Sequence, residues 1–198
     1  MATELALIGD SIRMGYQETV RRELEPGIRV RSPEPNGGHS RNVLDHLDAW
    51  VLDRPPDAAH LNCGLHDLAK EFDSGLARVP LEEYRSNVAR IFERVQAADI
   101  RPVWATITPV DEVLHHRNKS FDRFEADVDA YNEAALEAAE AAGVPVNDLF
   151  AVIESAGRGR LLRDDGVHFT DEGSRLLGEA VAAFVRGLPG LVPGSAGG

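Results

Sequence analysis

Residues 4–25 read ELALIGDSIRMGYQETVRRELE and join an apolar run to an amphipathic segment. The first part, residues 4–9, has the composition of a buried strand, and residues 12–25 place Val20 and Leu24 on one side of a helix. A short polar sequence connects the two, and α/β proteins carry their binding groups where buried strands end. This stretch therefore predicts a strand–helix unit with a candidate site at its junction.

The alternation of strand and helix patterns continues along the chain. Further strands are predicted over residues 26–32, 57–63, 101–109 and 144–149, and helices over residues 41–52, 80–100, 124–143 and 169–188. Strands that alternate with helices indicate a parallel sheet covered on both faces, so we expect a three-layer α/β/α sandwich with five parallel strands. Two irregular segments, residues 64–79 and 110–123, follow strands and should lie at the crevice beside the carboxyl edge of the sheet.

Size and composition favour one globular domain. The chain has 198 residues, 43% of them hydrophobic, which is enough for a proper core, and we assign the domain to residues 1–188. The remaining residues, 189–198, read PGLVPGSAGG and predict a flexible tail.

The net charge and the lack of targeting patterns argue against nucleic acid and membranes as partners. A formal charge of −12 gives no general attraction to nucleic acid or to anionic membranes, and no basic run with interleaved aromatic residues is present. No apolar run approaches the roughly 20 residues of a membrane helix, and the N-terminal residues lack a signal-peptide pattern. Cys63 is the one cysteine, so no intrachain disulfide forms. We therefore expect a cytoplasmic protein with a small-molecule partner.

Ser11 is the first candidate for chemistry. It lies between a predicted strand and a predicted helix, so its hydroxyl should face the crevice and its N–H should lie at a helix N-terminus, where negative charge is favoured. Taken alone, Gly-Asp-Ser is a weak signal, because Asp10 or Ser11 could simply cap the helix.

Asp165 and His168 form the second candidate, in DDGVHFT just before the last helix. A serine nucleophile needs a base to take its proton, and that imidazole needs an acceptor to fix its tautomer. A tight loop can supply both from one segment. The alternatives are a surface Asp-Gly turn, and Asp164 as a rival acid with poorer spacing.

The third candidate is SPEPNGGHS, in which Gly37 and Gly38 follow the second strand. Glycine lets backbone N–H groups approach a ligand closely, and an ester hydrolase needs such donors for its oxyanion. The alternative is an ordinary Gly-Gly turn.

These motifs, with Gly64-Leu65-His66-Asp67 after the third strand, fall at one edge of the sheet in an order that resembles the SGNH hydrolases, also called the GDSL esterase and lipase family. The resemblance runs from residue 5 to about residue 185. It implies a flavodoxin-like fold, Ser11 as the nucleophile, and the N–H groups of Ser11 and Gly38 as oxyanion donors, with Gly37 as the neighbouring alternative. It also implies Asp165 and His168 as the rest of the triad.

The GLHD sequence departs from the family pattern, which is usually Gly-x-Asn-Asp. His66 stands where the asparagine would be, and an imidazole N–H can make the same donation to an oxyanion. We therefore interpret His66 as the third oxyanion donor. Asp67 is expected to brace this loop and, with Arg13, to lie at the substrate.

Several other residues are weaker candidates. Cys63 is interpreted as a small buried residue, and His115 with His116 would need further ligands to hold a metal, so we expect no metal and no organic cofactor. Met14, Tyr16 and residues 115–124 either shape the pocket or form a solvated surface.

The resemblance implies a serine esterase that hydrolyses small acyl esters, acetyl or short-chain, through an acyl-enzyme, with a carbohydrate as one candidate alcohol. The compact chain lacks a long apolar lid, which favours short acyl groups over lipids. Two alternatives stay open: an acyltransferase that uses the same triad, and a non-catalytic binding module on the same fold. Retention of the serine, aspartate and histidine speaks against the second.

Overall fold

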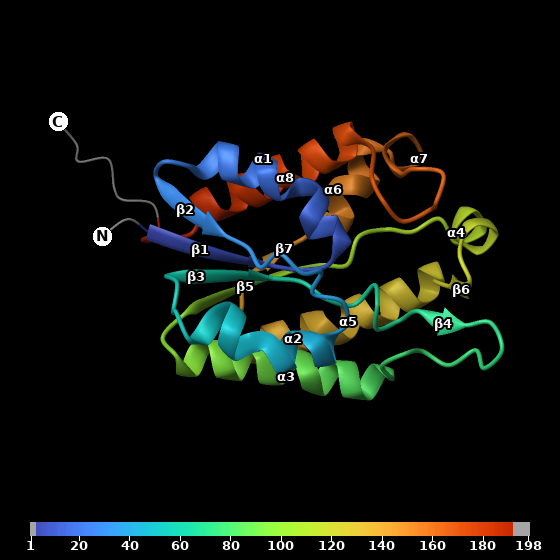
Figure 1. Cartoon of the computed structure of the whole chain (residues 1–198), viewed down its shortest axis with the longest axis horizontal. Helices are drawn as coiled ribbons and strands as arrows, with labels where there is room; N and C mark the ends of the chain where they lie inside the picture. The colour runs from blue at the N-terminus through green and yellow to red at the C-terminus, as the bar shows by residue number, and fades with distance from the viewer. Residues whose placement is uncertain (1–2, 192–198) are drawn as a thin grey trace.

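The protein is built on a five-stranded parallel sheet, which the computed structural model describes within residues 3–191 (Figure 1). The strands are β1 (Thr3–Ile8), β2 (Ile28–Arg31), β3 (Ala58–Leu61), β5 (Arg101–Ala105) and β7 (Val146–Asn147). They lie in the order β2-β1-β3-β5-β7, and every neighbouring pair is parallel. This is the flavodoxin-like order, so the predicted fold class is confirmed.

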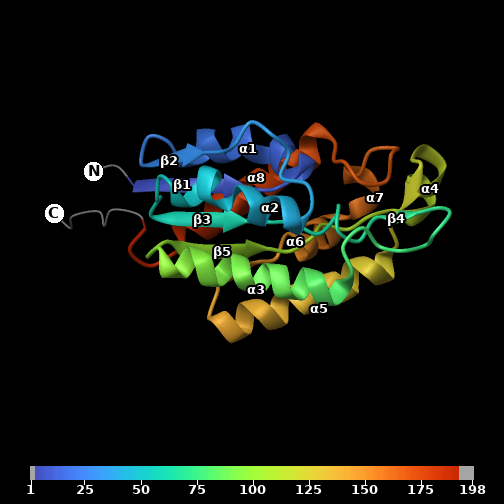
Figure 2. The ribbon, with the colours of Figure 1, turned by 60° about the horizontal axis from the view of Figure 1, so that its bottom comes forward.

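Helices cover both faces of the sheet, as Figures 1 and 2 show. One face carries α1 (Ser11–Leu24), α6 (Leu149–Ala156) and α8 (Asp171–Arg186), and the other carries α2 (Ser40–Leu47), α3 (Leu81–Ala97) and α5 (Glu125–Ala142). A π-helical turn, η1 (Asp48–Leu52), extends α2, and two short helices, α4 (Glu112–Asn118) and α7 (Arg158–Leu161), lie beyond the carboxyl edge of the sheet.

The central strands are buried on both faces, which explains their almost uninterrupted apolar sequences. Leu5, Leu7 and Ile8 of β1 are fully buried, and β3 is buried along its whole length. Strands of this kind leave few polar side chains except at their ends. Among residues 3–191, no helix has both the length and the apolar character that crossing a membrane requires.

The strand order creates a switch point between β1 and β3. From β1 the chain passes to β2 on one side, and it then crosses back to β3 on the other side. In open α/β sheets the crevice at such a point is the usual ligand site. The residues that follow β1 and β3, Ser11 and His66, are thereby brought to adjacent strand ends.

The two segments predicted to be irregular contain short elements that the sequence pattern does not reveal. Two-residue strands, β4 (Lys70–Glu71) and β6 (Phe121–Asp122), pair in antiparallel fashion and join these segments beyond the main sheet. Residues 110–123 also contain α4, and the predicted strand 144–149 is shorter than expected, because α6 begins at Leu149. Of the predicted tail, residues 189–191 form a turn with Leu191 buried, and residues 192–198 lie outside the described residues.

Gly178 of α8 packs tightly against α1, which gives a test of the packing. A Cβ atom there would lie 2.6 Å from Thr19 Cβ and 2.9 Å from Tyr16 O. We expect Gly178→Ala to lower the free energy of unfolding by about 1–3 kcal/mol despite the higher helix propensity of alanine. Chemical denaturation measures the change. Gly159→Ala is the control, because nothing lies within 4 Å of its Cβ position, and equal stability of the two variants would contradict the packing argument.

Candidate active site

Ser11 is the first residue of α1 and follows β1 after two residues. Asp10 caps the helix, since its Oδ1 accepts a hydrogen bond from the N–H of Ile12 at 2.9 Å. The cap leaves the N–H of Ser11 with no acceptor among residues 3–191. The N–H of Ser11 is therefore available to a ligand at the carboxyl edge of the sheet.

Asp165 and His168 meet Ser11 from the loop before α8. The His168 ring lies 2.9 Å from Ser11 Oγ through Nε2 and 2.5 Å from Asp165 Oδ2 through Nδ1. Gly166 shapes this loop with a φ of +73°, and a Cβ atom there would lie 2.5 Å from Asp111 O. The structure thus joins the three residues predicted as a triad in one chain of hydrogen bonds. Asp164, the rival acid, is exposed.

The Asp165 carboxylate is held by several donors. Oδ1 accepts the N–H groups of His168 at 2.9 Å and of Val167 at 3.2 Å, and Oδ2 also accepts from Lys119 Nζ at 3.1 Å. Burial acts to raise the pKa of Asp165, but the bonds from His168, Val167 and Lys119 outweigh it and hold the pKa below the ordinary range. The carboxylate is therefore ionised and fixed in orientation.

A cavity of about 270 Å³ opens beside Ser11. It is lined by Asp10, Ser11, Asn36, Leu65, His66, Lys119, Phe121, Arg123, Val167 and His168. Asn36, Lys119, Phe121 and Arg123 were not singled out from the sequence. The last three lie within residues 115–124, the segment that sequence reasoning left open between pocket wall and solvated surface.

His66 lines the cavity and makes no hydrogen bond to another residue of the described chain. Burial, which outweighs the opposing effect of Asp10, lowers its pKa, so the ring is neutral near pH 7 and carries one N–H. An unpaired N–H beside a serine hydroxyl is the arrangement expected of an oxyanion donor.

Gly37 and Gly38 are placed differently from the prediction. The N–H of Gly38 donates to Asn36 Oδ1 at 2.8 Å, and the N–H of Gly37 donates to Gly9 O at 3.0 Å. Neither glycine lines the cavity, whereas Asn36 does. The Gly38 N–H becomes available to a ligand only if the Asn36 side chain moves.

Arg13 and Asp67 are corrections to the predicted substrate contacts, because both are buried away from the cavity. Arg13 is 1% exposed and donates to the carbonyl oxygens of Gly9 and Pro35. Asp67 is 0% exposed, and its two oxygens accept the N–H of Ser40 at 2.9 and 3.0 Å. Both side chains hold loops together, which for Asp67 agrees with the bracing role expected from the sequence.

Within the described chain, the surroundings of Cys63, His115 and His116 give none of them a role in nucleophilic or metal chemistry. Cys63 is buried, and burial raises the pKa of its thiol well above the ordinary value, which makes it a poor nucleophile. His115 is buried, while His116 is exposed and bonds to Asp122. Within residues 3–191, no group of three or more His, Cys, Asp or Glu side chains is arranged to hold a metal ion.

Comparison with solved structures identifies the class of fold. A lipase/acylhydrolase from Enterococcus faecalis superposes with a TM-score of 0.80 at 22% identity, covering 93% of this chain and 96% of that one. The crystal structure of an acetyl xylan esterase gives a TM-score of 0.75 at 19% identity, covering 92% and 99%. At such identities the likeness establishes the fold.

Sequence comparison then identifies the family. The profile of the GDSL-like lipase/acylhydrolase family matches residues 7–176, and the chain belongs to this family. The isoamyl acetate-hydrolyzing esterase 1 homolog of Homo sapiens is 25% identical over 150 residues, which are 70% of this chain and 60% of that protein. A GDSL esterase/lipase of Arabidopsis thaliana is 27% identical over 160 residues, 76% of this chain and 62% of that protein. The match thus spans about three fifths of each relative.

The buried Asp67 carboxyl gives a prediction about stability and pH. Burial, partly offset by the hydrogen bonds from Ser40, raises the pKa of Asp67 to about 6. The unfolded chain releases this proton near pH 4, so folding becomes less favourable as the pH rises from about 4 to 6. We expect the free energy of unfolding of Asp67→Asn, relative to the original chain, to increase by about 1–3 kcal/mol over that range. Urea denaturation at several pH values measures it, and a constant difference would contradict the raised pKa.

Proposed function

We propose that this chain is a serine esterase that hydrolyses acetyl or short-chain esters through an acyl-enzyme. The observation that carries the proposal is the continuous hydrogen-bond chain from Ser11 Oγ through His168 to Asp165 Oδ2, with distances of 2.9 and 2.5 Å. Family membership and the esterase names of the human and Arabidopsis thaliana relatives support the same class of reaction.

In the proposed reaction, Ser11 Oγ attacks the ester carbonyl while His168 Nε2 takes the hydroxyl proton. The C–O bond to the alcohol breaks, and His168 returns the proton to the departing oxygen. A water molecule then gives a proton to His168 as it attacks the acyl-enzyme carbonyl. The bond from that carbon to Ser11 Oγ breaks, and His168 returns the proton to Ser11 Oγ, which releases the acid and restores both residues. Asp165 keeps Nδ1 protonated and stabilises the imidazolium that forms in each half of the reaction.

The proposed oxyanion site combines the free N–H of Ser11 with the N–H of His66, both beside the cavity. Gly38 joins them when Asn36 releases its N–H. The lysine on Asp165 does not serve as a base here, because it donates to a carboxylate that is already ionised. Apart from the water that attacks the acyl-enzyme, the proposed chemistry thus uses only the side chains and backbone of this chain.

The size of the cavity supports a small substrate. The volume of about 270 Å³ lies just below the range of about 300–1,000 Å³ that is usual for small-molecule sites, which suits a short acyl group better than a lipid chain. The human relative is named for an acetate ester, and one structural neighbour is an acetyl xylan esterase. We therefore propose an acetyl or short-chain ester, with a carbohydrate among the candidate alcohols.

The first test is the release of p-nitrophenol from acetate and octanoate esters. We expect faster release from the acetate, and a loss of about 10⁴-fold or more in kcat for Ser11→Ala, because the nucleophile is removed. Ser155→Ala is the matched control, since Ser155 is exposed on α6. A phosphonate that labels serine nucleophiles provides a second readout. Unchanged turnover by Ser11→Ala, or phosphonate labelling at another residue, would contradict the proposal.

His66 is tested by comparing His66→Ala with His66→Asn. Removing an oxyanion donor lowers kcat by about 10²–10³-fold, so alanine should do so with little change in KM, and asparagine should recover most of the rate. His46→Ala is the control, because His46 is exposed on α2. If alanine leaves kcat intact, His66 is not an oxyanion donor.

A further inference from the structure

Arg123 carries a positive charge that is almost completely buried beside Ser11. Its side chain is 5% exposed, it lines the cavity, and no carboxylate of residues 3–191 pairs with it. Burial lowers the pKa of the guanidinium to about 10, which still leaves it charged near pH 7. Buried charges are normally paired, because their desolvation is costly.

The contacts of Arg123 use only part of its hydrogen-bonding capacity. Nε donates to Leu65 O at 2.6 Å, and Nη1 donates to His115 Nε2 at 2.9 Å. The guanidinium also lies 4.9 Å from the centre of the Phe121 ring. Nη2 has no hydrogen-bond partner among the described residues. The side chain is therefore fixed on one side and left with a free donor on the other.

Arg13 shows what a buried arginine looks like when its role is structural. It is also without a carboxylate partner, but its three nitrogens all find acceptors, in Gly9, Pro35 and Gln17, and it does not line the cavity. Arg123 differs on both counts. This contrast indicates that the open donor of Arg123 is directed at a ligand.

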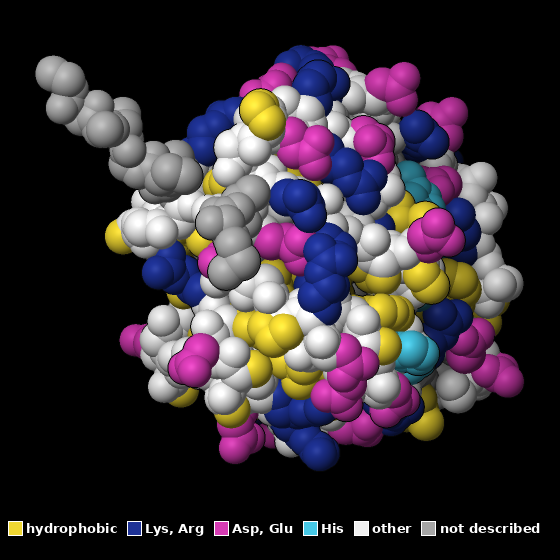
Figure 3. Space-filling view, turned by 60° about the vertical axis from the view of Figure 1, so that its left-hand side comes forward, with side chains coloured by type: hydrophobic (Ala, Val, Ile, Leu, Met, Phe, Trp, Pro, Cys, Tyr) yellow, Lys and Arg dark blue, Asp and Glu magenta, His cyan; other side chains and the backbone are white. Residues whose placement is uncertain are grey.

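Among the described residues that line the cavity, Arg123 is the cation without a carboxylate partner. Lys119 is engaged by Asp165 Oδ2, the oxygen that also accepts from His168. Asp10 caps α1 through Oδ1, and its Oδ2 is buried without a hydrogen-bond partner. Elsewhere the charges are mixed, since acidic and basic side chains are interspersed on the face shown in Figure 3. An anionic group would therefore be attracted locally by Arg123, although the chain charge is −12 and the buried Asp10 also lines the cavity.

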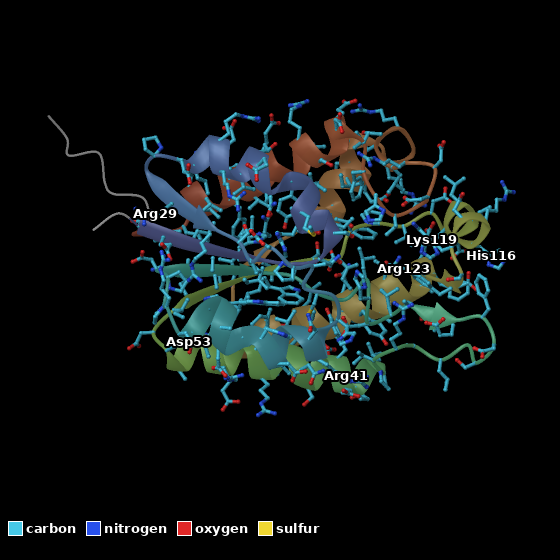
Figure 4. All side chains as sticks on the ribbon, viewed as in Figure 1. Arg29, Arg41, Asp53, His116, Lys119 and Arg123 are labelled. Carbon is cyan, nitrogen blue, oxygen red and sulfur yellow. The ribbon has the colours of Figure 1, made fainter. Side chains whose placement is uncertain are left out.

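We propose that the cavity selects esters that carry a carboxylate or a similar anionic group, which Arg123 binds while the ester carbonyl lies at Ser11. The inference rests on the proposed esterase function and adds to it a class of substrate. Arg123 is thus a specificity-determining residue, and the serine, His66 and His168 act on the ester itself. Figure 4 shows Arg123 and Lys119 near β6 and α4, at the end of the molecule opposite Arg29.

The test compares esters that differ only in charge. p-Nitrophenyl hemisuccinate is compared with p-nitrophenyl methyl succinate, which caps the carboxylate, and 4-acetoxybenzoate with its methyl ester places the charge on the alcohol side. We expect kcat/KM to be at least about tenfold higher for the anionic member of one pair, because charged hydrogen bonds are the stronger ones. Arg123→Gln should abolish this ratio, while Arg123→Lys should keep part of it.

Arg29→Gln is the matched control, since Arg29 is an exposed residue of β2 and its replacement removes one positive charge far from the cavity, which should leave the ratio unchanged. The ratio separates specificity from any loss of structure in Arg123→Gln, whose fold is checked by thermal unfolding. Equal kcat/KM within both pairs, or a ratio that survives in Arg123→Gln, would overturn the inference while leaving the esterase proposal intact.

Binding gives a readout that does not depend on turnover. Calorimetry measures the affinity of Ser11→Ala for an anionic half-ester, monomethyl succinate or 4-acetoxybenzoate, and for the neutral methyl ester of each. We expect Ser11→Ala to bind the anionic ligand at least about tenfold more tightly than its neutral methyl ester. The double variant with Arg123→Gln should bind the two ligands with equal affinity. If no ester is cleaved, the esterase proposal fails and this measurement alone decides the cavity's preference. Absence of any difference between the charged and capped ligands would refute the role of Arg123.

Discussion

A parallel sheet of apolar strands has to be covered on both faces, and this constraint determines where the protein can place polar groups. Leu5, Leu7 and Ile8 of β1 are fully buried, and helices cover both faces of the sheet that contains this strand. Side chains along the strands therefore pack the core, and chemistry is confined to the strand ends. The order β2-β1-β3 then brings the ends of β1 and β3 together, which is why Ser11 and His66 line one cavity although they are far apart in sequence.

The parts of the fold that the sequence predicts are those with a strong local signal. The long helices and the buried strands have clear periodicity, and the Asp165–His168 spacing is itself a local geometry, since one turn joins the two side chains. The two-residue strands β4 and β6 have no period to detect, and their pairing links segments about fifty residues apart. Only the three-dimensional structure brings Arg123 to Leu65 O.

The misplaced predictions have a common physical cause. Arg13 and Asp67 are polar residues next to motifs, and a sequence does not show whether such a residue faces the ligand or the protein interior. Here both satisfy backbone groups of neighbouring loops, Pro35 for Arg13 and Ser40 for Asp67. The N–H of Gly38 is likewise taken by Asn36, a contact that the Asn-Gly-Gly sequence permits but does not require. Loops at a crevice need such internal hydrogen bonds, because they lack the backbone hydrogen bonds that join neighbouring strands of a sheet.

Two cations at the cavity illustrate how similar side chains take different roles through their partners. Lys119 and His168 both donate to Asp165 Oδ2, so the positive charge of Lys119 holds this carboxylate in place. The other carboxylate oxygen, Oδ1, accepts two backbone N–H groups. With every direction of approach occupied, Asp165 can hold His168 in only one orientation, the one that faces Ser11. Arg123 has no carboxylate to fix, and its bonds to Leu65 O and His115 instead anchor the loop that carries His66. Its remaining donor is therefore held at a constant position relative to both His66 and Ser11, as selection of a charged substrate requires, because a mobile cation would bind an anion without aligning the ester.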